Sequence, residues 1–474
     1  MQTGYDVILR GGLVVDPANG VNRVADVALS GGKVAEVGEV TRPAKAERDC
    51  TGLVVMPGII DSHVHLSPWL GGAPGHRMLA LAGVTFALDL AGPIDGVTRF
   101  AASHGCGLTI GCIDYVRPGH TVSSVDPQSD ELRDTLARAR KSGAIGLKLL
   151  GGHFPMTPEA SGRIIQVCAD AGAYVACHSG TLNTPQNIDG MRESCEAAAG
   201  NPLHLAHINS YTRGLDKSAL VEAEEAIALI NANPNIWAES YLAPINGNSG
   251  KCANGIPESV ATERNLERGG FAPTKDGLAD AIAAGWAMVH LPRDGVHVLQ
   301  GGPEGLAAWQ QAETDIGISF MANPPEPRLH LATAKRADGS FAIDGLATDG
   351  GGIPRNDLCS RGLALVHLDA LSLEGFVIKT AVNPARVLGL SARKGHLGVG
   401  ADADVTVIDL ARLTPVASYG GGKPILADGQ VVGTGCTMMV PPEGADHVRG
   451  LGLNVLIAEA GTMIPRRAEA APAP

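Results

Sequence analysis

The chain has 474 residues, of which 45% are hydrophobic and 18% are charged. This composition supports a sizeable folded core and excludes a chain that is disordered throughout. Acidic residues outnumber basic residues by 49 to 37, and the resulting net charge of −12 argues against a nucleic-acid backbone as partner. The length suits one large domain together with a smaller one.

The two ends of the chain have a similar β-rich pattern. Short strand candidates separated by Gly-Gly turns occupy residues 5–40, and comparable apolar runs return beyond residue 404. We therefore predict a small β-sandwich domain built from both termini, at residues 1–56 plus 391–445. The Ala- and Pro-rich end of the chain, residues 464–474, predicts a disordered tail.

The middle of the chain, residues 57–390, alternates apolar strand candidates with helical stretches. Periodicity and capping residues predict helices at 127–142, 158–171 and 217–231. Repeating β–α units indicate a parallel sheet, and we predict an α/β fold of the (β/α)₈ TIM barrel type. Residues 240–348 interrupt the alternation and predict an insertion of loops over the active-site face.

The cysteines and the first residues favour a cytoplasmic protein. The nine cysteines are odd in number and scattered, with no C-x-x-C pair, which suits a reducing compartment better than a disulfide framework. The N-terminus lacks the layout of a signal peptide. No apolar run reaches the roughly 20 residues that span a bilayer, so we expect no membrane partner.

An apolar strand candidate at residues 54–60 leads into Asp61, His63 and His65. Side chains alternate along a strand, so these three are expected to point the same way. Two imidazoles at the end of one strand are a ready pair of metal ligands. An isolated His-x-His also occurs by chance where a strand meets a loop. Further candidate ligands elsewhere in the chain are therefore needed to favour a metal site.

Further polar residues close apolar strand candidates. Lys148 stands in an apolar run, where an ammonium group is costly unless it is salt-bridged or is carbamylated by CO₂ into a metal-bridging carboxylate. His178 ends another strand, and Asp349 precedes three glycines, where an ordinary turn aspartate is the alternative. His204 and His207 face opposite sides of one strand. We expect His207 to point into the barrel and His204 to pack under a helix.

In order and spacing, six residues resemble the metal ligands of the amidohydrolase superfamily, in its binuclear-metal branch: His63, His65, Lys148, His178, His207 and Asp349. The segments Met56–His65, Gly83–Thr85, Asn383–Leu390 and Gly395–Val405 carry the same resemblance, which covers most of the chain. The resemblance implies the predicted barrel and β-sandwich, and it implies an enzyme.

The resemblance also implies two divalent metal ions, expected to be Zn²⁺, with cobalt, manganese and iron as alternatives. Their ligands would be His63, His65 and Asp349 for the first metal, His178 and His207 for the second, and N6-carboxylated Lys148 for both. A hydroxide formed between the metals would attack the substrate, while Asp349 would move the water's proton to the leaving nitrogen.

The reaction implied is hydrolysis of a C–N amide bond in a linear N-acyl amino acid or a cyclic amide, as in N-acyl-D-amino-acid deacylases and hydantoinases. A partial likeness of residues 178–208 to the amidohydrolase subunit of formylmethanofuran dehydrogenases leaves N-formyl amides open. A deaminase is disfavoured, because no glutamate stands three residues after His178 or His207. A non-catalytic scaffold and a hydrolase of phosphotriesters or lactones are further alternatives.

Two residues are candidates to stabilise the oxyanion of the reaction. His153 occupies the position, five residues after Lys148, where hydantoinase-like enzymes have a tyrosine, and Tyr115 ends an earlier strand. Each of them is otherwise an ordinary loop residue. A substrate carboxylate would need an arginine, and three follow strand ends: Arg117, Arg213 and Arg355. We expect a small-molecule amide as partner and a homo-oligomeric assembly.

Overall fold

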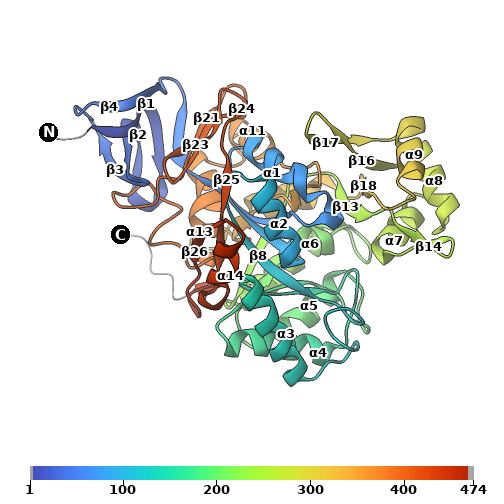
Figure 1. Ribbon diagram of the computed structural model, residues 1–474. Coiled ribbons are helices and arrows are strands. Elements are labelled where there is room, and N and C mark those ends of the chain that lie inside the picture. The colour runs from blue at the N-terminus through green and yellow to red at the C-terminus, as the bar shows by residue number, and fades with distance from the viewer. Residues whose placement is uncertain (1–3, 468–474) are drawn as a thin grey trace.

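The structure is a computed structural model that describes residues 4–467. Both ends of the chain form one nine-stranded sheet, and the middle forms a β/α barrel (Figure 1). A small four-stranded sheet, inserted late in the barrel, stands on the side of the barrel opposite the terminal sheet. The terminal sheet confirms that a small β domain is built from both termini.

The barrel consists of eight parallel strand positions along a closed path. Seven of them are β6 (Ile59–His65), β7 (Val84–Ala91), β8 (Cys106–Val116), β9 (Gly146–Leu150), β10 (Tyr174–His178), β11 (Leu203–Leu205) and β12 (Ile236–Ser240). The eighth comes in two pieces, β19 (Gly345–Leu346), which pairs with β12, and β20 (Gly350–Gly351), which pairs with β6. The predicted (β/α)₈ fold is confirmed.

Side-chain alternation along these strands separates the barrel interior from the helix-facing layer. Leu147 and Leu149 belong to the large apolar cluster that includes the helices, whereas Phe86, Tyr174 and Trp237 belong to a second cluster inside the barrel. The covering helices up to residue 232 are α1 (Gly72–Leu81), α2 (Ile94–His104), α3 (Ser129–Ser142), α4 (Pro158–Asp170), α5 (Ile188–Ala198) and α6 (Ala219–Ala232). Three of these match the predicted helices.

The later helices complete the outer layer of the barrel. They are α10 (Pro325–Thr333), α11 (Leu358–His367), α12 (Leu373–Val377), α13 (Asn383–Val387) and α14 (Ala445–Gly450). As predicted for α4, its N-cap Thr157 accepts a hydrogen bond from the amide of Ala160. No helix within residues 4–467 is long and apolar enough to cross a membrane.

The terminal sheet joins strands from the two ends of the chain. It comprises β1 (Tyr5–Asp16), β2 (Val21–Ser30), β3 (Lys33–Gly38), β4 (Ala44–Asp49), β5 (Val54–Pro57), β21 (Val405–Asp409), β22 (Thr414–Gly420), β23 (Lys423–Ala427) and β24 (Gln430–Val431). The join is made by β5, which pairs with β1 on one side and with β21 on the other. Lys33 and Asp402 add an ion pair of 2.7 Å between the two ends.

Two segments near the C-terminus differ from the prediction. β25 (Gly435–Val440), which falls in the range assigned to the sandwich, pairs with β8 of the barrel and with β26 (Asn454–Ile457). Residues 464–467 of the predicted disordered tail are packed, because Ile464 is buried and Arg467 lies 3.2 Å from the buried Asp344. The rest of that tail, residues 468–474, lies outside the described residues.

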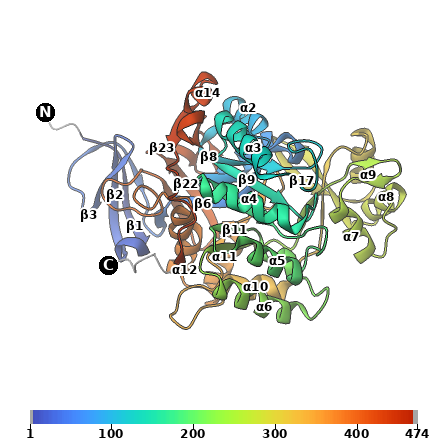
Figure 2. The same ribbon diagram turned by 90° about the horizontal axis from the view of Figure 1, so that it is seen from below.

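The insertion is a folded unit rather than a set of loops. Its sheet is β13 (Asn246–Ser249), β18 (Gly317–Phe320), β16 (Ala287–Arg293) and β17 (Val296–Gln300), with a β14–β15 hairpin (Cys252–Ala253, Ile256–Pro257) beside it. Helices α7 (Val260–Arg268), α8 (Lys275–Ala283) and α9 (Gly302–Gln311) accompany the sheet. Trp309, Ile318 and Phe320 belong to an apolar core of its own. Figure 2 shows the unit projecting from the barrel.

Candidate metal centre

All six residues predicted as metal ligands line one cavity of about 490 Å³. They come from the ends of β6, β9 and β10 and from the segments that follow β11 and β19. The cavity therefore lies at the carboxyl ends of the barrel strands, where the active sites of such barrels are found. Its volume is in the range of ordinary small-molecule sites.

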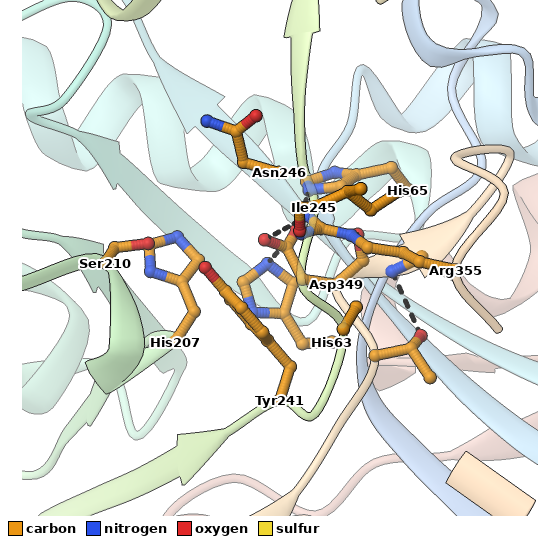
Figure 3. Close-up of polar contacts among 12 residues, drawn as sticks. His63, His65, His207, Ser210, Tyr241, Ile245, Asn246, Asp349 and Arg355 are labelled. Carbon is orange, nitrogen blue, oxygen red and sulfur yellow. Dashed lines mark hydrogen bonds and ion pairs between the residues drawn. The ribbon is translucent and has the colours of Figure 1, made fainter. Parts of the chain in front are cut away.

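The first half of the cluster is formed by His63, His65 and Asp349 (Figure 3). Asp349 Oδ1 lies 2.8 Å from His65 Nε2 and 3.4 Å from His63 Nε2. One ligand atom from each residue falls within 4.8 Å of the others. Asp349 has a φ of 52° between β19 and β20, and its amide donates to the carbonyl oxygen of His63. This kink in the eighth strand carries the carboxylate to the histidine pair.

The second half of the cluster is formed by Lys148, His178 and His207, all buried. The ring centroids of the two histidines are 4.3 Å apart. Burial is the main cause that lowers the pKa of Lys148 to about 8 and the pKa values of both histidines well below their ordinary value. Neutral imidazole is the form that binds metals.

Three nitrogens of this half have no hydrogen-bond partner among the described residues: Lys148 Nζ, His178 Nε2 and His207 Nδ1. Buried polar atoms without a partner are costly, so their convergence on one cavity calls for a ligand. Imidazole nitrogens and carboxylate oxygens are the donors that divalent transition metals accept. The residues present fit two metal ions.

Glu239, at the end of β12, links the two halves and was missed in the sequence. Its Oε1 accepts hydrogen bonds of 2.7 Å from His63 Nδ1 and from the amide of His207. Burial alone would raise the pKa of Glu239, but His63 and His204 lower it to about 2. The carboxylate fixes His63 with Nε2 toward Asp349. The available signal was a glutamate closing an apolar strand, as the other candidates do.

The prediction that His204 packs under a helix is wrong. His204 lies inside the barrel, with Nδ1 2.8 Å from the hydroxyl of Tyr174 and Nε2 3.5 Å from Glu239 Oε1. β11 ends at Leu205, and His207 adopts a left-handed φ of 36°. Because the chain turns there, alternation no longer separates the two histidines, and both face the interior.

Asp61 does not join the cluster, although alternation placed it with His63 and His65. The pairing of β6 with β7 shifts register between Asp61 and Val64, so the simple alternation is broken. The carboxylate of Asp61 accepts hydrogen bonds from the amide and the hydroxyl of Thr348. It therefore fixes the strand that carries Asp349.

The structure separates the two oxyanion candidates. His153 lines the cavity, and its ring centroid lies 5.1 Å from that of His178. Tyr115 lines a different cavity, of about 330 Å³, where its hydroxyl lies 2.8 Å from His120 Nδ1. Only His153 is brought to the cluster.

The three candidate arginines also differ in their surroundings. Arg355 is buried, forms an ion pair with Asp349 and donates to the carbonyl oxygen of Ile245 (Figure 3). Arg117 lines the cavity with its guanidinium 4.1 Å from the ring centroid of Phe154. Arg213 lines the cavity too. Arg355 is thus occupied by contacts within the protein, whereas Arg117 and Arg213 face the space that a substrate would fill.

The cavity lies at the carboxyl ends of the strands of a β/α barrel and is lined by imidazoles, a lysine and a carboxylate. This arrangement defines the class of metal-dependent barrel hydrolases.

Residues 325–440 match the model of the Amidohydrolase family. Dihydroorotase from Geobacter metallireducens is 26% identical over 433 residues, covering 85% of this chain and 90% of that protein. N-acyl-D-glutamate deacylase from Alcaligenes xylosoxydans xylosoxydans is 26% identical over 489 residues, covering 93% and 96%.

A solved D-aminoacylase mutant aligns with a TM-score of 0.65 at 19% identity, covering 91% of this chain and 99% of that one. This likeness concerns the fold and extends over nearly the whole of both chains. Together with the family match and the relatives, it confirms the predicted resemblance. The chain is therefore similar to amidohydrolases along most of its length.

Proposed function

We propose that this protein is a metal-dependent hydrolase that cleaves a C–N amide bond, other than a peptide bond, in a linear N-acyl amino acid or a cyclic amide. The observation that carries the proposal is the cavity with six convergent metal-ligand side chains, three of which have buried nitrogens without a partner. The relatives named above, a dihydroorotase and a deacylase, are hydrolases of such bonds.

The proposed cofactor is a pair of Zn²⁺ ions. The ligands would be His63, His65 and Asp349 on one side, His178 and His207 on the other, and Lys148 between them. Carboxylation of Lys148 forms a bond from Nζ to the carbon of CO₂ and releases one proton; the lowered pKa of Lys148, about 8, favours the neutral amine that reacts. When bound, the metals would lower the pKa of a water molecule and polarise the amide carbonyl.

Asp349 would carry the proton from water to the leaving nitrogen, because its carboxylate opens onto the cavity. Burial alone would raise the pKa of Asp349, but Arg355 and then His63 lower it well below its ordinary value. The ion pair with Arg355 also holds the carboxylate in place. His153, beside His178, would donate a hydrogen bond to the developing oxyanion.

Metal analysis and a substrate screen test the proposal together. We expect close to two metal ions per chain, and hydrolysis within a panel of N-acyl-D-amino acids, N-formyl amino acids and hydantoins. Full activity in protein stripped of metal would contradict the mechanism. Turnover of an aryl phosphotriester, with none of the amides cleaved, would contradict the reaction class.

The proposal includes two properties predicted from the sequence. One is a homo-oligomer, which light scattering of the purified protein would detect as a mass above 48.6 kDa, the mass of one chain. The other is a cytoplasmic location, supported by nine cysteines that are all free. Fractionation of the producing cells checks the location.

A further inference from the structure

Arg213 is a charged residue of the cavity wall whose charge no nearby acidic side chain balances. Among residues 4–467, no carboxylate lies within 4.0 Å of its guanidinium. Its hydrogen-bond partners are neutral oxygens: Asn323 Oδ1 at 3.0 Å from Nε, and Ser210 Oγ and the hydroxyl of Tyr241, each at 3.4 Å from Nη2. The other terminal nitrogen, Nη1, bonds to none of the described residues.

The neutral partners of Arg213 are themselves held in place. Asn323 is buried, and its amide nitrogen donates to the carbonyl oxygens of Ala243 and Ile245, at 3.2 and 2.7 Å. Its side-chain oxygen is therefore left to accept from Arg213 and from the hydroxyl of Tyr241. The guanidinium is positioned without being neutralised, which is an arrangement suited to an anionic ligand.

Two nearby cations are already matched by acids. Lys251 of the cavity wall lies 3.4 Å from Asp315, and Arg355, which is not one of the wall residues, is paired with Asp349. Asp349 and Asp315 are thereby engaged, and the remaining acid of the wall, Glu258, has no ion pair with Arg213. Arg213 is therefore a cation of the cavity wall without an acidic partner among the described residues.

Arg213 lies on the His207 side of the cluster. His207, Ser210 and Arg213 belong to one short segment, and all three line the cavity. In Figure 3, Ser210 lies beside His207, away from the Asp349–Arg355 pair.

We propose that Arg213, with Ser210 beside it, binds a carboxylate of the substrate, so that the preferred substrates are anionic amides such as N-acyl amino acids rather than neutral amides. The inference rests on the proposed hydrolase function and specifies its substrate class. The Nε and Nη2 atoms of the planar guanidinium are bonded within the protein, and Nη1 is available to pair with a substrate carboxylate in a charge-assisted hydrogen bond. Its role would be binding and orientation, not bond cleavage.

The test compares each N-acyl amino acid with its carboxamide, which has nearly the same shape and no charge. The panel uses N-formyl and N-acetyl derivatives of D- and L-alanine and glutamate. Wild-type protein should prefer the acids. Arg213→Gln should raise KM for the acids by roughly 10- to 100-fold, with little change in kcat and none for the carboxamides. Arg213→Lys, which keeps the charge without the fork, should fall between the two.

Arg117→Gln is the matched removal of another arginine from the same cavity, and it should keep the preference for acids. Unchanged metal content in each variant shows that the centre is intact. The role of Arg213 would be overturned if wild type and Arg213→Gln had equal KM values for the acids. It would also be overturned if only Arg117→Gln lost the preference for acids over carboxamides. Neither result would affect the proposed hydrolase function. Cleavage of no amide by the metal-loaded wild type would instead overturn the function on which it rests.

Discussion

The metal centre and the insertion are built in different ways around the same cavity. The centre takes its side chains from neighbouring barrel strands and is fixed by buried contacts such as those of Glu239. The insertion has its own sheet and apolar core, and it supplies polar residues of the cavity wall from β13 and the loop that follows. The difference teaches that the metal ligands and part of the cavity wall come from separately folded parts.

Lys148→Ala should have the largest effect, because it removes the proposed bridge between two metals. We expect loss of one or both metal ions and a fall in activity well beyond the roughly 10- to 100-fold range of outer-shell changes. Short carboxylic acids should restore part of the activity. Metal content and turnover are the measurements.

Lys379→Met is the matched control for Lys148→Ala, since Lys379 is also a fully buried lysine. Its ammonium group, however, donates to three backbone carbonyl oxygens, including that of Ala332 at 2.8 Å. We expect this variant to lose stability but keep its metals. Full metal content and activity in Lys148→Ala would remove the bridging role.

Glu239→Gln should weaken both halves of the centre, because one carboxylate oxygen is bonded to His63 and to the backbone of His207. We expect metal affinity to fall roughly 10- to 100-fold, measured by competition with a chelator. Glu222→Gln is the control: Glu222 is equally buried but bonds only backbone amides of residues 214–217. Equal metal affinity in the two variants would refute a specific role for Glu239.

Trp309→Ala tests whether the insertion acts separately from the centre. Trp309 is buried in the core of the insertion, and its Nε1 donates to the carbonyl oxygen of Gly250, between the cavity residues Ser249 and Lys251. We expect KM to rise by roughly tenfold or less as the wall loosens, with metal content unchanged. Loss of metal in this variant would show that the two regions are not independent.

Asp402→Asn should have the smallest effect, because Asp402 lies in the terminal β domain away from the cavity. Burial alone would raise the pKa of Asp402, but Lys394 and then Lys33 lower it below its ordinary value of 3.8. Its contribution to stability, roughly 1–3 kcal/mol, is therefore present above pH 3.8 and is lost as the pH falls through the lower, folded-state pKa.

Thermal unfolding of wild type and Asp402→Asn across pH 3 to 7 measures this contribution. The difference in Tm should be full near neutral pH and should shrink in acid. Metal content and KM should match those of wild type. A difference that grows on acidification would have the wrong sign for a carboxylate with a lowered pKa.

The sequence by itself determined the barrel, the β domain from both termini and the six candidate ligands. Apolar strands that end in polar residues are a local pattern, and parallel strands bring their ends to one edge. His63, His178 and Asp349 could therefore be grouped from the sequence alone. The family resemblance rested on the same local signals. It identified the reaction class but not the substrate.

The tertiary structure decided what depends on turns and on contacts between distant segments. A register shift redirected Asp61 to Thr348, and a left-handed turn at His207 brought His204 inside. Pairing across the barrel revealed Glu239 as the link between the two halves. The three arginines look alike in sequence, but their partners differ, because a charge is balanced by whatever lies near it in space. That is the physical reason why Arg213 could be singled out only from the folded chain.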